Sequence, residues 1–379
     1  MIKEKTKITG MILCLLLAGG LRAYAAEIPL VNTESLSLAE VKNLSINYSS
    51  DGVILRESVT GELVIKEYMT KDRPQYYAVI SRSGDSLSIR PGRRPWFSWS
   101  WRSRVEIYLP QSFRENIRIS YGSGGFTAET DLTGYRSVDL SVGSGAMFLN
   151  RVAAETLSVR VSSGELEARS MGGNSFISLS SGKLKIDELT GEEHRVKISS
   201  GHARIDHIRG TGAVEVSSGA FAVSRLEGDS SIEIQSGSIQ IAALTGTAHR
   251  IRVSSGRITI AEARGQIEGR LSSGTLNLEN FSGHGDFDIN SGNINLGLWE
   301  PTGDMRVTVT SGDINLTIPR KTSFNLDAST NSGRISVDEG PEGTVRVSGN
   351  STILRPFGPS PEITIYARTT SGSIRIKRS

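Results

Sequence analysis

The chain has 379 residues, with 43 lysines and arginines against 40 aspartates and glutamates. Residues 1–25 contain four of the basic residues and one of the acidic residues, which leaves 39 of each sign in the rest of the chain and excludes a nucleic-acid partner held by overall basic charge. The only cysteine, Cys14, lies in the same leading segment, so the rest of the chain has neither disulfides nor a thiol nucleophile.

Residues 1–25 have the pattern of a secretory signal peptide. Three lysines precede the apolar run ITGMILCLLLAGGL, which is too short to span a bilayer comfortably, and Ala23 and Ala25 occupy the −3 and −1 positions of a cleavage site. We therefore expect the protein to be exported, to the periplasm, the cell surface or the medium. No later stretch approaches the roughly 20 apolar residues of a membrane helix, so we expect no transmembrane segment in the mature chain.

Residues 26–115 are rich in strand-forming sequence but follow no fixed spacing. We expect them to form irregular β coils that cap the N-terminal end of a repetitive region, residues 116–379, because the first repeat of a stack needs a cover. Within this cap, the segment RPGRRPWFSWSWRSR, residues 90–104, has an unusual composition, with three of the chain's four tryptophans beside several arginines.

Two interpretations of residues 90–104 remain open. The aromatic residues from Phe97 to Trp101 alternate with serine, so in a strand they would share one face and, with the arginines, suit sugars, lipid headgroups or anionic polymers. Alternatively, the segment is a hairpin whose aromatic face covers the end of the stack, and the two roles are compatible. The candidate ligand-binding residues are Arg93, Arg94, Trp96, Phe97, Trp99, Trp101, Arg102 and Arg104.

A Ser-Gly dipeptide dominates the rest of the chain, at a spacing of 18 or 19 residues over most of the run. Its glycines are residues 124, 145, 164, 182, 201, 219, 237, 256, 274, 292, 312, 333 and 372. Relative to each glycine, apolar residues fall at positions −5, −3, +2 and +4, usually with another at +7. This spacing by two indicates strands with alternate side chains buried, and no window has a sustained helical period.

A second glycine lies nine residues after many of the Ser-Gly glycines. These second glycines are Gly173, Gly191, Gly210, Gly228, Gly246, Gly265 and Gly283. Each repeat is therefore a strand, a Ser-Gly corner, another strand and a second corner, and the one-residue variation in length falls just beyond the second corner, where it leaves the strand register intact. The pattern predicts an all-β fold: a parallel β-solenoid, right-handed, of about a dozen 18–19-residue two-strand coils and roughly 60 Å long.

The serine before the corner glycine is present in every copy, and we interpret it as structural. Its place in the alternation predicts an inward-facing hydroxyl that bonds unpaired backbone groups at the corner. A nucleophile needs an adjacent base, and no histidine or lysine repeats beside this serine. The predicted corner ladder includes Ser163, Gly164, Ser181, Gly182, Ser200, Gly201, Ser218 and Gly219.

Two histidines and two aspartates in adjacent coils, His202, His207, Asp187 and Asp206, raise the question of a metal site. The predicted register stacks the two aspartates on the outer face, interleaved with lysine and arginine, and points His207 away from His202. Carboxylates mixed with cations on an exposed strand face are typical of a solvated surface, so we expect no metal and no cofactor.

A polysaccharide lyase or hydrolase is the enzymatic alternative, because β-helices host such chemistry. It requires acidic residues that converge for calcium binding or for acid and base catalysis. In the predicted register no three carboxylates converge, and the outward column three residues after the glycine has Asn277, Asn295 and Asn315 near its end.

The repeats ISLSSGKLKID and VEVSSGAFAVS, with the opening patterns LSINYSSDGVIL, DSLSIRP and VEIYLPQSF, resemble a family of bacterial β-strand-repeat proteins described as proposed adhesins, a domain of unknown function related to envelope-stress-operon proteins. The resemblance covers nearly all of the mature chain. It implies a β-helix-like fold in the cell envelope, with no established reaction and no catalytic residues. We therefore expect a non-enzymatic, adhesin-like or scaffolding protein whose partner is an envelope glycan, a membrane surface or another envelope protein.

Overall fold

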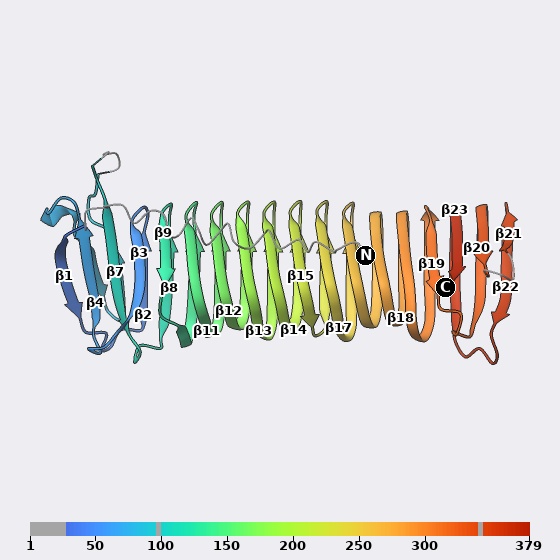
Figure 1. Cartoon of the computed structure of the whole chain (residues 1–379), viewed down its shortest axis with the longest axis horizontal. Helices are drawn as coiled ribbons and strands as arrows, with labels where there is room; N and C mark the ends of the chain where they lie inside the picture. Colours follow the sequence, from blue (N-terminus) through green and yellow to red (C-terminus); the bar gives the residue numbers. More distant parts are fainter. Residues whose placement is uncertain (1–27, 96–99, 340–343) are drawn as a thin grey trace, which may run out of the picture.

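The structure is a computed structural model that describes residues 28–95, 100–339 and 344–379. Strands of successive coils lie side by side and form one long stack (Figure 1). Neighbouring coils pair in parallel through the middle of the stack, which confirms the predicted β-solenoid. The described residues contain one helical element, the short 3₁₀ turn η1 (Pro74–Tyr76). In this part of the chain no helix has the length and apolar character needed to cross a membrane.

The regular coils occupy the middle of the chain. Their strands are β8 (Asn116–Tyr121), β9 (Gly125–Ala128), β10 (Leu132–Val142), β11 (Ala146–Val161), β12 (Glu165–Leu179), β13 (Lys183–Ile198), β14 (His202–Val216), β15 (Ala220–Glu227), β16 (Ser230–Ile234), β17 (Ser238–Val253) and β18 (Arg257–Ser311). Strands such as β12 and β13 begin after one Ser-Gly corner and end before the next, so the second corner is a bend within the strand. In the coil of β15 and β16 the second corner, at Gly228, separates two strands instead.

The register between coils follows the sequence pattern. In the pairing of β13 with β14, Lys183 lies opposite His202 and Lys185 lies opposite Arg204, as predicted. The register shifts only between Thr190 and Glu193, just beyond the second corner, which confirms the predicted position of the extra residue. Both flanking strands therefore keep the same side chains inside the coil.

The core runs without interruption along the stack. In the coil around Gly182 its members are Ile177, Leu179, Leu184, Ile186 and Leu189, each at most 2% exposed. These are the positions that the alternation predicts. Each such side chain stabilises the fold by about 1.5–3 kcal/mol relative to an exposed position, and each coil has an apolar neighbour on both sides.

Both kinds of corner need glycine, chiefly because neighbouring coils approach closely there. At the Ser-Gly corners the coils approach closely: a Cβ added to Gly182 would lie 2.1 Å from the carbonyl oxygen of Gly164, and one added to Gly219 would lie 2.4 Å from that of Gly201. The second corner at Gly210 is equally close, with an added Cβ 2.2 Å from the carbonyl oxygen of Gly191, and its φ of +127° also favours glycine.

The prediction for the corner serines is partly wrong. Ser163, Ser181, Ser200 and Ser218 are exposed, so their hydroxyls face solvent and do not point inward. A backbone ladder satisfies the corner instead, because the N–H of each serine donates to a carbonyl of the previous coil, as from Ser181 to Ser162 at 2.7 Å. The bend at the corner reverses the expected alternation.

The N-terminal end contains a coil that lies out of chain order. Its irregular strands are β1 (Leu30–Leu36), β2 (Asn43–Tyr48), β3 (Gly52–Ser58), β4 (Leu63–Met69), β5 (Val79–Ser83), β6 (Ser86–Arg90) and β7 (Ser103–Pro110). The coil β2–β3 pairs in parallel with β8 and β9 on one side and with β6 and β7 on the other. β4 and β5 then pair antiparallel to β7 and β6, and β1 pairs antiparallel to β4. The predicted cap, residues 26–115, therefore includes two parallel coils as well as reversed strands.

The C-terminal end has the same kind of rearrangement. Its strands are β19 (Ile314–Ile318), β20 (Phe324–Asp338), β21 (Thr344–Ser348), β22 (Ser351–Phe357) and β23 (Thr364–Arg378). β23 pairs in parallel with β18 and β19 on one side and with β20 on the other, so the last coil of the chain lies between two earlier coils (Figure 1). β21 and β22 pair antiparallel to β20 and cover it.

Candidate functional site

The segment of residues 90–104, here called the arginine–tryptophan segment, connects β6 to β7 in the outermost parallel coil at the N-terminal end. Three of its predicted binding residues, Trp96, Phe97 and Trp99, lie outside the described residues. The other five are described, and they divide into residues that hold the segment on the stack and residues that face solvent.

Arg94 is an anchor, because its side chain is only 7% exposed. Its Nη2 lies 2.5 Å from Oε1 of Glu67, its Nη1 forms an ion pair with Asp51, and its Nε donates to the carbonyl oxygen of Tyr76 at 3.0 Å. The guanidinium also lies 5.6 Å from the ring centre of Tyr48. All of these partners are internal, so in this arrangement Arg94 is unavailable to a ligand, in contrast to the expectation from its sequence neighbours.

The carboxylates that hold Arg94 are themselves fixed by other parts of the cap. Glu67 is fully buried and its Oε2 accepts from Asn32 Nδ2 at 3.0 Å and from the backbone N–H of Ala78 at 2.9 Å. Asp51 is 2% exposed and accepts from the hydroxyl of Ser103. Burial, together with these carboxylates, raises the pKa of the Tyr48 phenol well above its usual value. The cluster therefore joins β1, β2, β4, β7 and the segment.

The second end of the segment is anchored at Thr70. The backbone N–H of Thr70 donates to the carbonyl of Arg102 at 3.1 Å, and the backbone N–H of Arg102 donates to the Thr70 hydroxyl at 3.2 Å. The Trp101 ring packs edge-on against Tyr76, with ring centres 5.1 Å apart. Trp101 is partly buried, and its contact with Tyr76 helps to hold this end of the segment on the cap.

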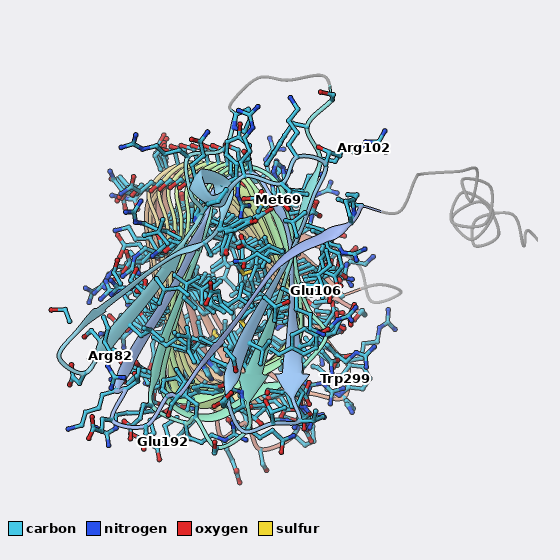
Figure 2. The ribbon with its side chains drawn as sticks, turned by 90° about the vertical axis from the view of Figure 1, so that its left-hand side faces the viewer. Met69, Arg82, Arg102, Glu106, Glu192 and Trp299 are labelled. Carbon is cyan, nitrogen blue, oxygen red and sulfur yellow. The ribbon has the colours of Figure 1, made fainter. Side chains whose placement is uncertain are left out.

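Of the five described binding residues, Arg93 and Arg102 are exposed. Figure 2, which looks along the stack, places Arg102 at the periphery, directed away from the core. The backbone N–H of Arg93 donates to the carbonyl oxygen of Gln75 at 2.8 Å. Arg104 differs, because it lies 3.4 Å from the buried carboxylate of Glu106 and 4.2 Å from the ring centre of Tyr68. Arg93 and Arg102 therefore face solvent from a segment that is anchored to the cap at both ends.

The corner serines line a second surface feature. A groove of about 520 Å³ follows the Ser-Gly corners of successive coils, and its walls include Ser200, Ser218, Ser236, His202 and Arg257. Its floor is backbone, held by the N–H ladder described above. The exposed hydroxyls are regularly spaced, but each lacks the base that a nucleophile requires.

Three of the four residues considered for a metal site, Asp187, Asp206 and His207, lie beside ionisable side chains on the outer face. Asp206 accepts from Nε of Arg204 at 2.8 Å, Asp187 lies 4.0 Å from Nζ of Lys185, and His207 lies 3.3 Å from Glu227. Among the described residues, no group of three histidine, cysteine, aspartate or glutamate side chains is placed to hold a metal ion.

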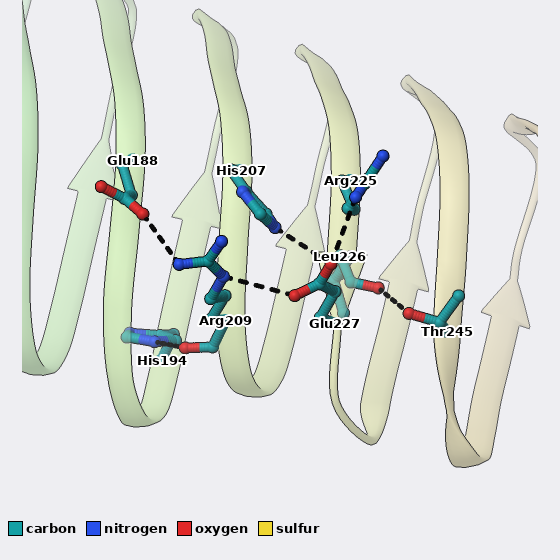
Figure 3. A network of polar contacts seen from close by, with 8 residues as sticks. All are labelled: Glu188, His194, His207, Arg209, Arg225, Leu226, Glu227 and Thr245. Carbon is teal, nitrogen blue, oxygen red and sulfur yellow. Dashed lines mark hydrogen bonds and ion pairs between the residues drawn. The ribbon is translucent and has the colours of Figure 1, made fainter.

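Ion pairs cross from coil to coil on this face. Figure 3 shows Arg209 between Glu188 and Glu227, at 3.1 Å and 3.3 Å, and these two carboxylates come from the coils on either side. All three side chains are more than a third exposed, so solvent screening leaves such pairs a small part of the stability. Their effect is to give the outer face an even mixture of charge.

Two buried histidines were not identified from the sequence. Nδ1 of His194 lies 2.8 Å from the Ser175 hydroxyl in the previous coil, and its Nε2 lies 2.9 Å from the carbonyl oxygen of Arg209 in the next. His249 repeats this with Ser230 at 2.9 Å and Arg264 at 3.0 Å. The signal in the sequence is Gly-x-x-His-Arg, at residues 191–195 and 246–250, in two of the coils that have an extra residue.

These pairs have the composition of a Ser–His dyad but not its accessibility. His194 is 1% exposed and Ser175 is 7% exposed, and the carbonyl of Arg209 holds the second ring nitrogen. Burial lowers the pKa of His194 and of His249 below the usual value, so both are neutral at pH 7. The extra residue is fixed on the other side by Asn174, whose Oδ1 accepts the N–H groups of Glu192 and Glu193 at 3.2 Å. The Ser–His pairs therefore satisfy polar groups at the bulge where the extra residue shifts the register.

Comparison with known proteins identifies one sequence family. The sequence profile of the Toastrack DUF4097 family matches residues 41–262 and 214–377, which together cover most of the chain. No curated protein matches the chain in sequence.

Several solved structures are similar at low identity. A proposed cell adhesion protein from Clostridium sporogenes is 10% identical, with a TM-score of 0.24, over 92% of this chain and 98% of its own. A proposed adhesin from Parabacteroides merdae is 13% identical, with a TM-score of 0.28, over 69% and 94%. A proposed lipid binding protein from Parabacteroides distasonis is 15% identical, with a TM-score of 0.29, over 74% and 96%. Because TM-scores this low do not establish a shared fold, the family assignment is based on the sequence profile.

Proposed function

The chain belongs to the Toastrack DUF4097 family, and from that premise we propose that it is an exported, non-enzymatic, adhesin-like or scaffolding protein of the cell envelope. In this proposal the solenoid is a rigid support, and the arginine–tryptophan segment contacts an anionic surface, either an envelope polymer or a membrane. The signal-peptide pattern of residues 1–25 supports export. The neutral buried Ser–His pairs and the paired outer face offer no catalytic group to this surface.

The observation that carries the proposal is the double anchoring of the segment. Arg94 fixes one end through buried ion pairs, and Thr70 and Tyr76 fix the other. Removing one partner of a buried ion pair typically costs about 3–5 kcal/mol, so this anchoring is strong. Arg93, next to the first anchor, and Arg102, at the second, are exposed. A preorganised pair of guanidinium groups loses little entropy when it binds phosphate or carboxylate groups.

The test is co-sedimentation of residues 26–379 with anionic material. The probes are purified cell-wall sacculi and vesicles of phosphatidylglycerol and phosphatidylcholine, with pure phosphatidylcholine vesicles as the uncharged reference. We expect the wild-type protein to pellet with at least one anionic probe, and the double variant Arg93→Ser and Arg102→Ser to lose at least about tenfold in affinity, because both exposed charges are removed. Binding should also weaken between 50 mM and 300 mM salt.

The matched control is the double variant Arg151→Ser and Arg169→Ser, which removes the same charge from exposed positions on the coils. An equal loss in both double variants would show that binding depends on net charge alone and would refute a role for the segment. Failure of the wild-type protein to bind either anionic probe would refute the proposal as a whole. A comparison of sacculi with vesicles separates a polymer from a membrane as the partner.

A further inference from the structure

Trp299 is a large aromatic side chain in an unusual environment for a coil of this stack. It is 55% exposed, whereas the other coils mostly have polar or small residues facing outward. Figure 2 places it at the periphery of the stack, directed away from the core. Nζ of Lys321 lies 5.2 Å from its ring centre, which helps to hold the ring in position. An exposed tryptophan that is held in place is a surface on which another molecule can stack.

Beside Trp299 the outer face carries a ladder of three asparagines, one from each successive coil. Nδ2 of Asn295 donates to Oδ1 of Asn277 at 2.6 Å, and Nδ2 of Asn315 donates to Oδ1 of Asn295 at 2.7 Å. The ladder is tied at one end by Thr259, whose hydroxyl accepts from Asn277 at 3.4 Å, and at the other by Arg375, whose Nη1 donates to Asn315 at 3.3 Å. The amides are therefore held in one orientation.

The ladder uses only part of the hydrogen-bonding capacity of each amide. An asparagine side chain has two N–H donors and two acceptor lone pairs. Each amide in the ladder donates one hydrogen bond and accepts one, so one donor and one acceptor remain on each. The same donor and acceptor pair thus recurs at the spacing of neighbouring strands, about 4.8 Å. Such an array matches groups that both donate and accept, which is the property of a hydroxyl.

Trp299 and the ladder share one groove. Its volume is about 660 Å³, and its lining includes Asn277, Asn295, Asn315, Trp299, Asn280 and Thr317. Asn295, Gly297 and Trp299 alternate with the buried Leu296 and Leu298, so they face the same side of the strand. A Cβ at Gly297 would overlap the carbonyl oxygen of Glu279, so the backbones of the two coils approach closely between the amide and the ring.

We propose that this groove binds an uncharged polysaccharide, with Trp299 stacked on one sugar ring and the asparagine ladder bonded to hydroxyls of the neighbouring sugars. The C–H groups of a pyranose face carry partial positive charge and pack on the electron-rich face of an indole. The polar lining is mainly amide and hydroxyl, which favours a neutral chain over an acidic one. This site is at the opposite end of the stack from the arginine–tryptophan segment, and the inference does not depend on the proposed function (Figure 1).

The test is affinity electrophoresis of residues 26–379 in native gels that contain a soluble polysaccharide. The neutral probes are laminarin, hydroxyethyl cellulose, dextran and galactomannan, and the acidic probes are polygalacturonate and hyaluronate. We expect at least one neutral polysaccharide to retard the protein. Trp299→Ala should weaken that binding about tenfold or more, Trp299→Phe should retain part of it, and Asn295→Leu should weaken it about threefold to tenfold.

The matched control is Phe148→Ala, which removes another exposed aromatic side chain, 41% exposed, from a coil without the asparagine ladder. It should bind as the wild type does, and so should the Arg93→Ser and Arg102→Ser variant, which separates this site from the anionic one. Circular dichroism melting confirms that each variant is folded. The inference is wrong if no neutral polysaccharide retards the wild type, if only the acidic probes do, or if Trp299→Ala and Phe148→Ala behave alike.

Discussion

At the scale of single residues, the Ser-Gly corner is governed by the distance between coils. The glycines stack with their carbonyl oxygens directed at the next glycine, and the space for a side chain is absent. The serine in front of them is exposed and contributes its backbone N–H. The repeat of this dipeptide therefore reflects how closely the coils pack. The serine hydroxyls are exposed, and that of Ser123 also donates to the carbonyl oxygen of Ser49 at 2.9 Å.

Gly219→Ala should destabilise the protein by about 1–3 kcal/mol, because the new methyl group would overlap the carbonyl oxygen of Gly201. Gly125→Ala is the control, since an added Cβ there has nothing within 4 Å; it should be neutral or stabilising by up to about 1 kcal/mol. Urea unfolding followed by circular dichroism measures both. Equal unfolding midpoints for the two variants would contradict the close-packing explanation.

The buried histidines predict a pH dependence of stability. Burial lowers the pKa of His194 and His249 in the folded state, so below the unfolded pKa, near 6.5, the unfolded chain binds protons that the folded chain does not. The free energy of unfolding should be fully retained above pH 6.5 and should fall as the pH drops below it, by up to about 1.4 kcal/mol per pH unit for each histidine.

This dependence is measured from urea unfolding midpoints between pH 7.5 and pH 5.0. The double variant His194→Gln and His249→Gln should be less stable at pH 7.5 and should have a flatter profile, whereas His202→Gln, at an exposed position, should keep the wild-type slope. Asp229, near His249, accepts the N–H groups of Thr247 and Ala248, and these hydrogen bonds lower its pKa. Its contribution to the free energy of unfolding is therefore lost only at pH values below this measured range. An unchanged slope in the double variant would refute the assignment.

At the scale of elements, the ends of the stack differ from its middle in the order of the coils. In the middle, each strand pairs with the strands of the previous and next coils. At the C-terminal end, β23 occupies the place between β18–β19 and β20, so β20 depends on a strand that comes later in the chain. The position of β20 is therefore secured only when residues 364–378 are in place.

Ile374→Lys should loosen the C-terminal end selectively. Ile374 is fully buried in β23, and a charge there has no partner, so β23 should leave its position. We expect backbone amides of β19 to β22 to exchange rapidly in hydrogen–deuterium exchange, while β11 to β14 remain protected, because coils contact only their neighbours. Lys377→Ser, an exposed change in the same strand, should leave exchange unaltered. Faster exchange along the whole stack would instead show that the coils unfold as one unit.

At the scale of the whole molecule, the sequence predicts the coil but not its ends. The buried positions around Gly182, the register of Lys183 with His202 and the place of the extra residue all follow from local spacing. The position of β23 between β19 and β20 cannot be predicted in this way. Its apolar pattern is the same as that of the other coils, so several coils could pair with it equally well. The partners of Arg94 are also unpredictable from local pattern, since Asp51 and Glu67 reach it only through the pairing of distant strands.

The candidate sites are also predictable only in part from the sequence. Composition alone marks residues 90–104, but which arginines face solvent depends on the fold of the cap. The asparagine column is visible in the sequence, whereas its groove arises because Trp299 and the asparagines of three coils meet on one face. The inward orientation predicted for the corner serines failed because a bend does not continue the alternation of a strand.

The reversed strands at both ends limit how these rods can associate. A stack of identical parallel coils is a template on which a second copy can continue the same pairing, and repeated addition would produce a filament. Here β1 and β5 at one end, and β21 and β22 at the other, run opposite to the strands that they cover. The last parallel coil at each end is therefore already paired along its outer edge by strands of the same chain. A second copy cannot extend the parallel pairing from these edges unless it displaces the covering strands, and this disfavours a filament built by continued addition of coils.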